Sequence, residues 1–219
     1  MKLDLRLETT ATKIDVKEKI VEVEDKEGVK EKLEYDSLIL ATGSYPFVPP
    51  IKGRDKEGVF VLKTIEDGKR LNEAIKEASS AVVIGAGLIG LEAAVAFIER
   101  GLETTVVELL PQILPAMLDP DMARLVQRSL EDKGMKIMVG RGVEEILGNN
   151  RVSGVLVGGE KIPADIVLVA TGVRPNTQLA KDAGITIGET RGIKTNMKME
   201  TSVKDVYAAG DCAESVNII

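Results

Sequence analysis

The sequence predicts an α/β protein built on a parallel sheet, and three observations support this fold class. Strands and helices alternate from Ala81 to about residue 140. A glycine-rich turn joins the first strand of that series to its helix. A strand that ends in Ala-Thr-Gly occurs twice, at Ala41 and at Ala170, 129 residues apart (170 − 41). Alternating strands and helices are typical of a doubly wound sheet, in which each helix returns the chain to the start of the next parallel strand.

The alternating series begins with an apolar strand over 81–87 that ends in glycines. A helix is predicted over 88–100, where Gly101 supplies the left-handed residue that ends many helices. A strand over 104–109 follows. Asp119-Pro120 then gives an N-cap and a first-turn proline to a helix over 121–133, before a third strand over 135–140. This order is the mononucleotide-binding half of a Rossmann-like fold.

Shorter elements flank this series. Alternating polar and apolar residues predict a strand over 4–9, and a hairpin is expected around 26–28. Helical spacing of apolar residues predicts a helix in 65–80. Further strands are expected at 37–41, 59–64, 143–147, 151–157, 160–172 and 206–208.

The glycine turn carries the clearest functional signal. Gly85, Gly87 and Gly90 have the G-x-G-x-x-G spacing, with Leu88 and Ile89 between the last two. The first glycine makes the tight turn, the second admits a pyrophosphate, and the third allows close helix packing. The helix that follows offers free N–H groups and a positive dipole end to phosphates.

An acidic residue stands where a dinucleotide site needs one. Glu108 follows Gly87 by 21 residues (108 − 87), at the end of the second strand, where a carboxylate accepts hydrogen bonds from the adenosine ribose. No Lys or Arg follows closely in the sequence, so NAD(H) is predicted over NADP(H). The alternative is a plain turn with a solvated Glu108. A P-loop is excluded, because no Gly-Lys-Ser/Thr follows.

Composition excludes several other classes. A net charge of −6 leaves no basic footprint for nucleic acid. No apolar run approaches the roughly 20 residues of a membrane helix, and the charged N-terminus does not resemble a signal peptide, so a cytoplasmic protein is expected. The chain has no histidine and one cysteine, Cys212, so no metal site and no dithiol centre of its own are predicted.

The motifs together resemble a known family. The glycine turn, the two Ala-Thr-Gly strands and "DVYAAGDCA" occur in the order found in the FAD-dependent pyridine nucleotide–disulfide oxidoreductases. "VELLPQILPAMLDPDMA" is similar to the branch of NADH oxidases and coenzyme A-disulfide reductases. The resemblance implies a Rossmann-like NAD(P)-binding domain inserted into an incomplete FAD-binding domain of similar, three-layer ββα/α type. It implies 1–64 and 189–219 for the FAD domain and 65–188 for the NAD(H) domain.

The resemblance also implies roles for individual residues. The first Ala-Thr-Gly copy (Ala41, Thr42 and Gly43) and the pair Gly210-Asp211 would contact FAD, with Asp211 on the ribityl chain. The second copy, with Thr171 and Gly172, would lie on the NAD(H) side. The alternative is that both copies are ordinary β-turns with no contact to a cofactor.

Three other residues leave alternatives open. Glu92, placed in the first helical turn after the glycines, would lie near the reacting rings, or would simply favour a helix N-terminus. Arg174 is interpreted as a phosphate ligand or as an exposed turn residue. Cys212 is interpreted as a buried packing residue, against a redox role.

The sequence departs from the family in ways that affect activity. It has no second G-x-G-x-x-G and no early redox cysteine, and it stops soon after Asp211. The expectation is therefore a truncated chain with an incomplete FAD site, no catalytic residue of its own, and negligible turnover alone. An open sheet edge at the missing strand leads to the hypothesis of a homodimer.

Three functions follow from these expectations. The first is a fragment of an NADH-dependent flavoprotein oxidoreductase that passes hydride from NADH to FAD and then reduces a disulfide or oxygen. The second is a reductase of the rubredoxin or ferredoxin type, which passes electrons to a carrier protein. The third is a non-catalytic NAD-binding module, which would have no use for the flavin-side motifs.

Overall fold

The computed structural model describes residues 3–215, which fold into two compact units. Unit 1 combines the N-terminal segment up to Tyr45 with the C-terminal segment from Arg174. Unit 2 is the continuous segment between them, 46–173. The chain therefore passes between the units twice. None of the helices in the described part of the chain is long and apolar enough to cross a membrane.

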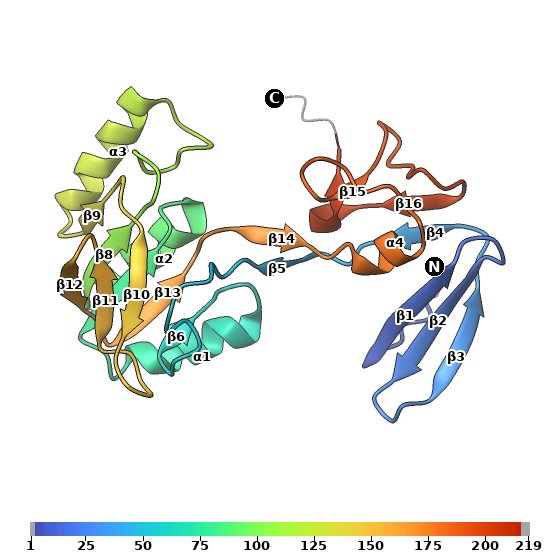
Figure 1. The fold of residues 1–219 in the computed structure, drawn as a ribbon, viewed down its shortest axis with the longest axis horizontal. Coiled ribbons are helices and arrows are strands. Elements are labelled where there is room, and N and C mark those ends of the chain that lie inside the picture. Colours follow the sequence, from blue (N-terminus) through green and yellow to red (C-terminus); the bar gives the residue numbers. More distant parts are fainter. Residues whose placement is uncertain (1–2, 216–219) are drawn as a thin grey trace. The chain divides into compact units, whose positions relative to one another are not determined.

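Unit 2 is built on a parallel sheet of five strands (Figure 1). In spatial order they are β6 (Val59–Phe60), β13 (Ile166–Val169), β7 (Ser80–Ile84), β8 (Glu103–Val107) and β9 (Lys136–Met138). Helices connect β6 to β7, β7 to β8 and β8 to β9, as is usual for parallel strands. Spatial order departs from chain order because β13, the last of the five strands in the chain, lies between β6 and β7.

Helices cover one face of this sheet. They are α1 (Ile65–Ile75), α2 (Leu88–Glu99) and α3 (Pro120–Glu131). Successive side chains of a strand point to opposite faces. In β7, Ala81 and Val83 pack in the helical core with Phe97 of α2, whereas Val82 and Ile84 face away from it.

An antiparallel meander covers the opposite face. It consists of β10 (Val143–Leu147), β11 (Gly154–Val157) and β12 (Glu160–Pro163). Ile146 and Val155 are fully buried against Val82 and Val167 of the parallel sheet. Unit 2 is thus a three-layer ββα domain, the type that the family resemblance implies.

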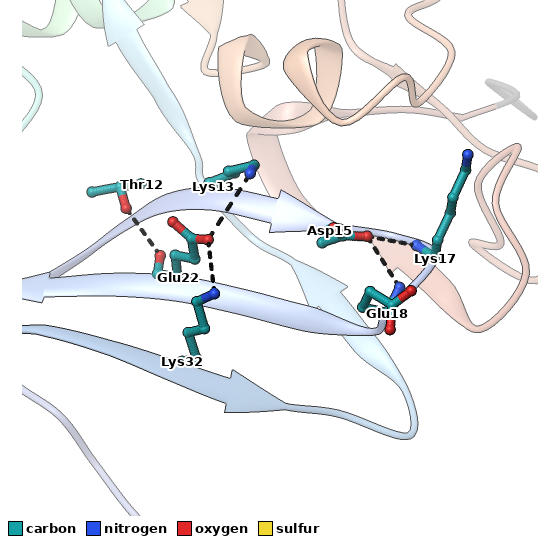
Figure 2. A network of polar contacts seen from close by, with 7 residues as sticks. All are labelled: Thr12, Lys13, Asp15, Lys17, Glu18, Glu22 and Lys32. Atoms are coloured by element: carbon teal, nitrogen blue, oxygen red, sulfur yellow. Dashed lines mark hydrogen bonds and ion pairs between the residues drawn. The ribbon is translucent and has the colours of Figure 1, made fainter.

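Unit 1 contains a three-stranded antiparallel sheet, formed by β1 (Thr9–Asp15), β2 (Ile20–Asp25) and β3 (Lys30–Glu34). Figure 2 shows polar contacts on this sheet, where Glu22 lies between Lys13 and Lys32. The Glu22 Oε1 atom is 3.9 Å from Lys13 Nζ and 3.8 Å from Lys32 Nζ. Asp15 accepts hydrogen bonds from the backbone N–H groups of Glu18 and Lys17 in the turn that follows β1, and these bonds lower the pKa of its carboxyl. The hairpin predicted around 26–28 is confirmed, with Gly28 at a φ of +82°.

The rest of unit 1 joins distant segments. β4 (Leu38–Leu40) pairs in parallel with β16 (Val206–Ala208), and β15 (Ile193–Lys194) pairs with β17 (Ala213–Glu214). Helix α4 (Gln178–Asp182) packs against β1, and a 3₁₀ turn covers Gly210–Cys212. Leu40, Ile193 and Cys212 share one small core.

Some predicted elements are shorter or absent. Residues 4–6 form no strand and β1 begins only at Thr9, because the alternating residues before it, Leu5 and Leu7, lie exposed with no layer against them. The strand predicted over 59–64 is reduced to β6, since Thr64 already caps helix α1.

The unit limits also differ from the predicted domain limits of 1–64, 65–188 and 189–219. Residues 46–64 belong to unit 2, because β6 pairs with β13 inside its sheet. Residues 174–188 belong to unit 1, because α4 packs on β1. The assignment of one unit to FAD and the other to NAD(H) stays a prediction.

The repeated Ala-Thr-Gly phrase has a definite structural role. Its two copies lead into β5 (Ser44–Pro46) and β14 (Val173–Pro175), which pair with each other. In unit 1 the Thr42 hydroxyl donates to the carbonyl oxygen of Asn176 at 2.6 Å, and the Asn176 N–H donates to the Gly43 carbonyl oxygen at 2.9 Å.

Unit 2 repeats this pattern in the second copy. The Thr171 hydroxyl donates to the Phe47 carbonyl oxygen at 2.6 Å, and the Phe47 N–H donates to the Gly172 carbonyl oxygen at 2.9 Å. Thr171 follows Thr42 by 129 residues (171 − 42), and Asn176 follows Phe47 by the same number (176 − 47). Two segments of the chain connect the units, and each follows one copy of the phrase. Each threonine hydroxyl donates to the segment that follows the other copy, which gives both copies the same structural role.

Candidate functional site

A cavity of about 890 Å³ lies in unit 2 at the carboxyl ends of β7, β8 and β13. In open α/β sheets, ligands bind at this edge of the strands. Most of the lining is apolar. Its members from the predicted site are Gly85, Gly87, Leu88, Ile89, Glu108, Thr171 and Gly172.

Two of the three motif glycines are required by the protein itself. Gly85 has a φ of +107°, and a Cβ there would overlap the carbonyl oxygen of Ala170. A Cβ at Gly90 would overlap the carbonyl oxygen of Gly85, and would also lie 3.3 Å from the Ala170 Cβ. These two glycines therefore let α2 pack closely on β7 and β13.

Gly87 is different. Its φ of −76° suits any residue, and a Cβ there would meet no protein atom within 4 Å. None of the neighbouring residues that the structure describes requires a glycine here, yet Gly87 lines the cavity. A residue without a Cβ at this point leaves room for a ligand to approach the backbone.

Helix α2 points its N-terminus at the same space. Gly87 is its N-cap and supplies no side-chain cap, and Leu88 and Ile89 are each 51% exposed at the cavity wall. The first N–H groups of a helix have no partner within the helix and carry its positive dipole end. This combination suits an anion such as a pyrophosphate.

Glu108 is buried, 8% exposed, and lines the cavity. One carboxylate oxygen, Oε2, accepts from the Ala86 N–H at 2.7 Å, and Oε1 accepts from the Leu110 N–H at 2.8 Å. The carboxylate thus holds the glycine turn against the end of β8. Because each oxygen can accept a second hydrogen bond, it retains capacity for a ribose hydroxyl.

Arg141 is a cavity residue that the sequence prediction missed. It follows β9 and lies in the lining together with Glu108. Its backbone N–H donates to the Glu108 carbonyl oxygen at 3.1 Å. It could have been found from the order of the strands, since β9 is the neighbour of β8 and the ends of parallel neighbours meet at one edge.

Glu92 does not belong to this lining. Helix α2 begins at Leu88, so its first turn contains no acidic residue and Glu92 comes one residue later, exposed. The prediction that Glu92 lies in the first turn is wrong. Arg174 also differs from the exposed turn residue considered above, because it is half-buried within β14.

The predicted flavin-side residues gather at one edge within unit 1. Since β4 and β16 are parallel, the Ala41–Gly43 turn and Gly210-Asp211 leave the same end of this pair, and the Ala209 N–H donates to the Leu40 carbonyl oxygen at 2.9 Å. The Ser44 hydroxyl donates to Asp211 Oδ2 at 2.8 Å. The described residues include no second glycine turn of the Gly85–Gly90 kind to hold a pyrophosphate beside this edge.

Cys212 is completely buried, and its thiol lies 3.3 Å from the carbonyl oxygens of Leu40 and Ala209. These contacts agree with the packing interpretation. No cluster of three or more acidic or cysteine side chains suitable for a metal ion occurs between residues 3 and 215.

Comparison with known proteins identifies the family. The model of the pyridine nucleotide-disulphide oxidoreductases matches residues 1–219. The chain belongs to this family. An NADH oxidase of Methanocaldococcus jannaschii is 46% identical over 219 residues, which cover 99% of this chain and 49% of that protein. A CoA-dependent NAD(P)H sulfur oxidoreductase of Pyrococcus furiosus is 36% identical, covering 94% of this chain and 48% of that protein.

Solved structures of pyridine nucleotide-dependent reductases and oxidases are similar to this chain. An NAD-dependent persulfide reductase from A. fulgidus superposes with a TM-score of 0.91 at 42% identity, covering 94% of this chain and 38% of that one. A water-forming NADH oxidase from Lactobacillus brevis bound to NADH gives 0.87 at 30% identity, covering 94% and 46%. The chain thus spans about half the length, or less, of these relatives.

Proposed function

We propose that the chain binds NADH in the cavity of unit 2, and that it serves as part of an NADH-dependent flavoprotein oxidoreductase. The observation that carries this proposal is the contrast among the glycines. Gly85 and Gly90 are fixed by packing, whereas Gly87 faces open space at the N-terminus of α2. A second glycine without a structural reason is what close approach of a pyrophosphate requires.

The remaining lining supports the same ligand. The α2 N-terminus, with Leu88 and Ile89, would hold the pyrophosphate, and Glu108 would accept hydrogen bonds from the adenosine ribose. Thr171 and Gly172 would lie towards the nicotinamide. The Thr171 hydroxyl already donates to the Phe47 carbonyl oxygen, so its contribution to NADH would come mainly from the backbone.

FAD is proposed for unit 1, by family membership and by the gathering of Ala41–Gly43 with Asp211 at one edge. When bound, FAD would accept hydride from NADH, and the whole protein would pass the electrons to a disulfide or to oxygen. Asp211, held by Ser44, would bind the ribityl chain. With no pyrophosphate turn among the described residues, tight FAD binding by this chain alone is not expected.

A second candidate acceptor is a carrier protein. The solved structures similar to this chain include a ferredoxin reductase from Rhodopseudomonas palustris and a putidaredoxin reductase–putidaredoxin complex. The two candidates share the NADH step, so they differ only in the acceptor. Assays of a full-length protein containing this chain, with coenzyme A-disulfide, oxygen and ferredoxin, would separate them.

The NADH step is tested by calorimetric titration of NADH into the purified chain and its Gly87→Val variant. The variant fills the open space at the α2 N-terminus, and its NADH affinity should fall at least about tenfold, while the loss of an N-cap glycine should lower its Tm by only a few °C. Gly68→Ala, which adds a methyl group to α1 outside the cavity lining, is the matched control and should leave NADH affinity unchanged. Equal NADH affinity of Gly87→Val and wild type would contradict the proposal.

A further inference from the structure

The strand order brings a basic side chain to the acidic end of the nucleotide cavity. The segment after β9 runs beside the segment after β8: the Arg141 N–H donates to the Glu108 carbonyl oxygen at 3.1 Å, and the Gly140 N–H donates to the Leu110 carbonyl oxygen at 2.8 Å. The backbone of Arg141 is therefore hydrogen-bonded directly to that of Glu108, the residue proposed to bind the adenosine ribose. An arginine side chain is long enough to reach the ribose from there.

Glu108 and Arg141 carry the charge of the cavity lining. Of the described residues that form the lining, Glu108 and Arg141 are the charged ones. The carboxylate of Glu108 is buried and already accepts two backbone hydrogen bonds, so it does not depend on Arg141 for its partners. The guanidinium is thus available to an anionic ligand at this end of the cavity.

The Arg141 side chain forms only a weak ion pair, with Glu160. Arg141 Nη1 lies 3.9 Å from Glu160 Oε2, and the two side chains are 55% and 65% exposed. An exposed ion pair at this separation contributes little, because water and salt screen it. A ligand phosphate could replace Glu160 as the partner and would offer the guanidinium two-pronged hydrogen bonding.

We infer that Arg141 binds the 2′-phosphate of NADPH, so that the cavity accepts NADPH as a second nucleotide besides NADH. This inference rests on the proposed NADH site and adds a specificity residue to it. NADH remains the preferred ligand, because Glu108 accepts from a free 2′-hydroxyl and repels a 2′-phosphate. Arg141 offsets part of that repulsion, so NADPH binds more weakly than NADH but measurably.

The test is calorimetric titration of four ligands into the wild type and Arg141→Gln: NADH, NADPH, 5′-AMP and adenosine 2′,5′-bisphosphate. The last two differ only in the 2′-phosphate. Arg141→Gln should weaken NADPH and the bisphosphate about tenfold, the loss of one charge-assisted pair, and should change NADH and 5′-AMP less than about twofold. Arg128→Gln, an arginine of α3 outside the cavity lining, is the matched control.

A second variant should strengthen, rather than weaken, the contact between Arg141 and the 2′-phosphate. Glu160→Gln removes the competing carboxylate and should strengthen NADPH binding about twofold, with no change for NADH. Raising KCl from low to physiological concentration should weaken NADPH more than NADH in the wild type, and this difference should disappear in Arg141→Gln.

Three results would overturn the inference. They are equal losses of NADH and NADPH affinity in Arg141→Gln, no loss of either, or no binding of NADPH and the bisphosphate to the wild type. Failure of the NADH site is distinguishable, because it would abolish NADH and 5′-AMP binding in the wild type itself. The bisphosphate would then still report whether Arg141 binds a 2′-phosphate.

Discussion

The packing role of Gly90 makes a quantitative prediction about stability. In an ordinary helix interior, Gly→Ala stabilises by about 1 kcal/mol, because alanine loses less backbone entropy on folding. At Gly90 the added Cβ would lie well under 3.0 Å from the Gly85 carbonyl oxygen and 3.3 Å from the Ala170 Cβ. Neither neighbour can rotate away, since one is backbone and the other is a methyl on the adjacent strand end.

Relief of this overlap requires α2 to move away from β7. Overpacking of a core costs about 1–3 kcal/mol, and backbone on one side of the clash places Gly90→Ala at the upper end. After the helical gain of about 1 kcal/mol, the net loss is about 2 kcal/mol, or about 4–8 °C in Tm for a chain of this size.

Gly68 in α1 provides the control. A Cβ there would meet only the Leu62 Cδ1, at 3.8 Å, an ordinary contact. Gly68→Ala should therefore raise the free energy of unfolding by up to about 1 kcal/mol. The assay is urea unfolding of the wild type and both variants, followed by circular dichroism. A Gly90→Ala protein as stable as Gly68→Ala would refute the packing role.

Three further outcomes follow from particular contacts. Thr171→Val removes the hydroxyl that donates to Phe47 and should lower the free energy of unfolding by about 1 kcal/mol in urea; unchanged stability would show that the bond contributes nothing. The pKa of Asp67 is lowered to about 2, chiefly by the backbone N–H of Thr64, so its contribution of about 1–2 kcal/mol is present above pH 4 and is lost as the pH falls towards 2. The stability difference between wild type and Asp67→Asn, measured in urea at pH 7 and at pH 2, should therefore shrink at the lower pH, and a constant difference would contradict this assignment. Cys212 is fully buried, so Ellman's reagent should modify it only after unfolding; rapid reaction of the folded protein would contradict its place in the core.

The sequence predicted best those elements whose signals are local. The apolar strands β7 and β8, the N1 proline of α3 and the left-handed glycine after α2 all appear where expected. Each depends on residues within a few positions of one another. The family resemblance, which depends on several such signals in order, is confirmed by the match of the whole chain.

Features that depend on which strands become neighbours require the strand order as well, because no local signal marks them. Arg141 is 33 residues from Glu108 (141 − 108), and only the β8–β9 pairing brings the two together. The bonds from Thr42 to Asn176 and from Thr171 to Phe47 likewise cross more than 120 residues of chain. For the same reason, the sequence suggested a ribose role for Glu108 but gave no sign that its carboxylate also holds the glycine turn.

The most direct test of the account is where NADH binds. Amide chemical-shift mapping of the ¹⁵N-labelled chain during NADH titration reports this residue by residue. We expect the largest shifts at Gly85, Gly87, Leu88, Ile89 and Glu108, around the carboxyl ends of β7 and β8, with little change in the β1–β3 sheet of unit 1. Shifts confined to unit 1, or no shifts near Gly87 at NADH concentrations that saturate binding, would contradict the assignment of unit 2 as the NADH-binding domain.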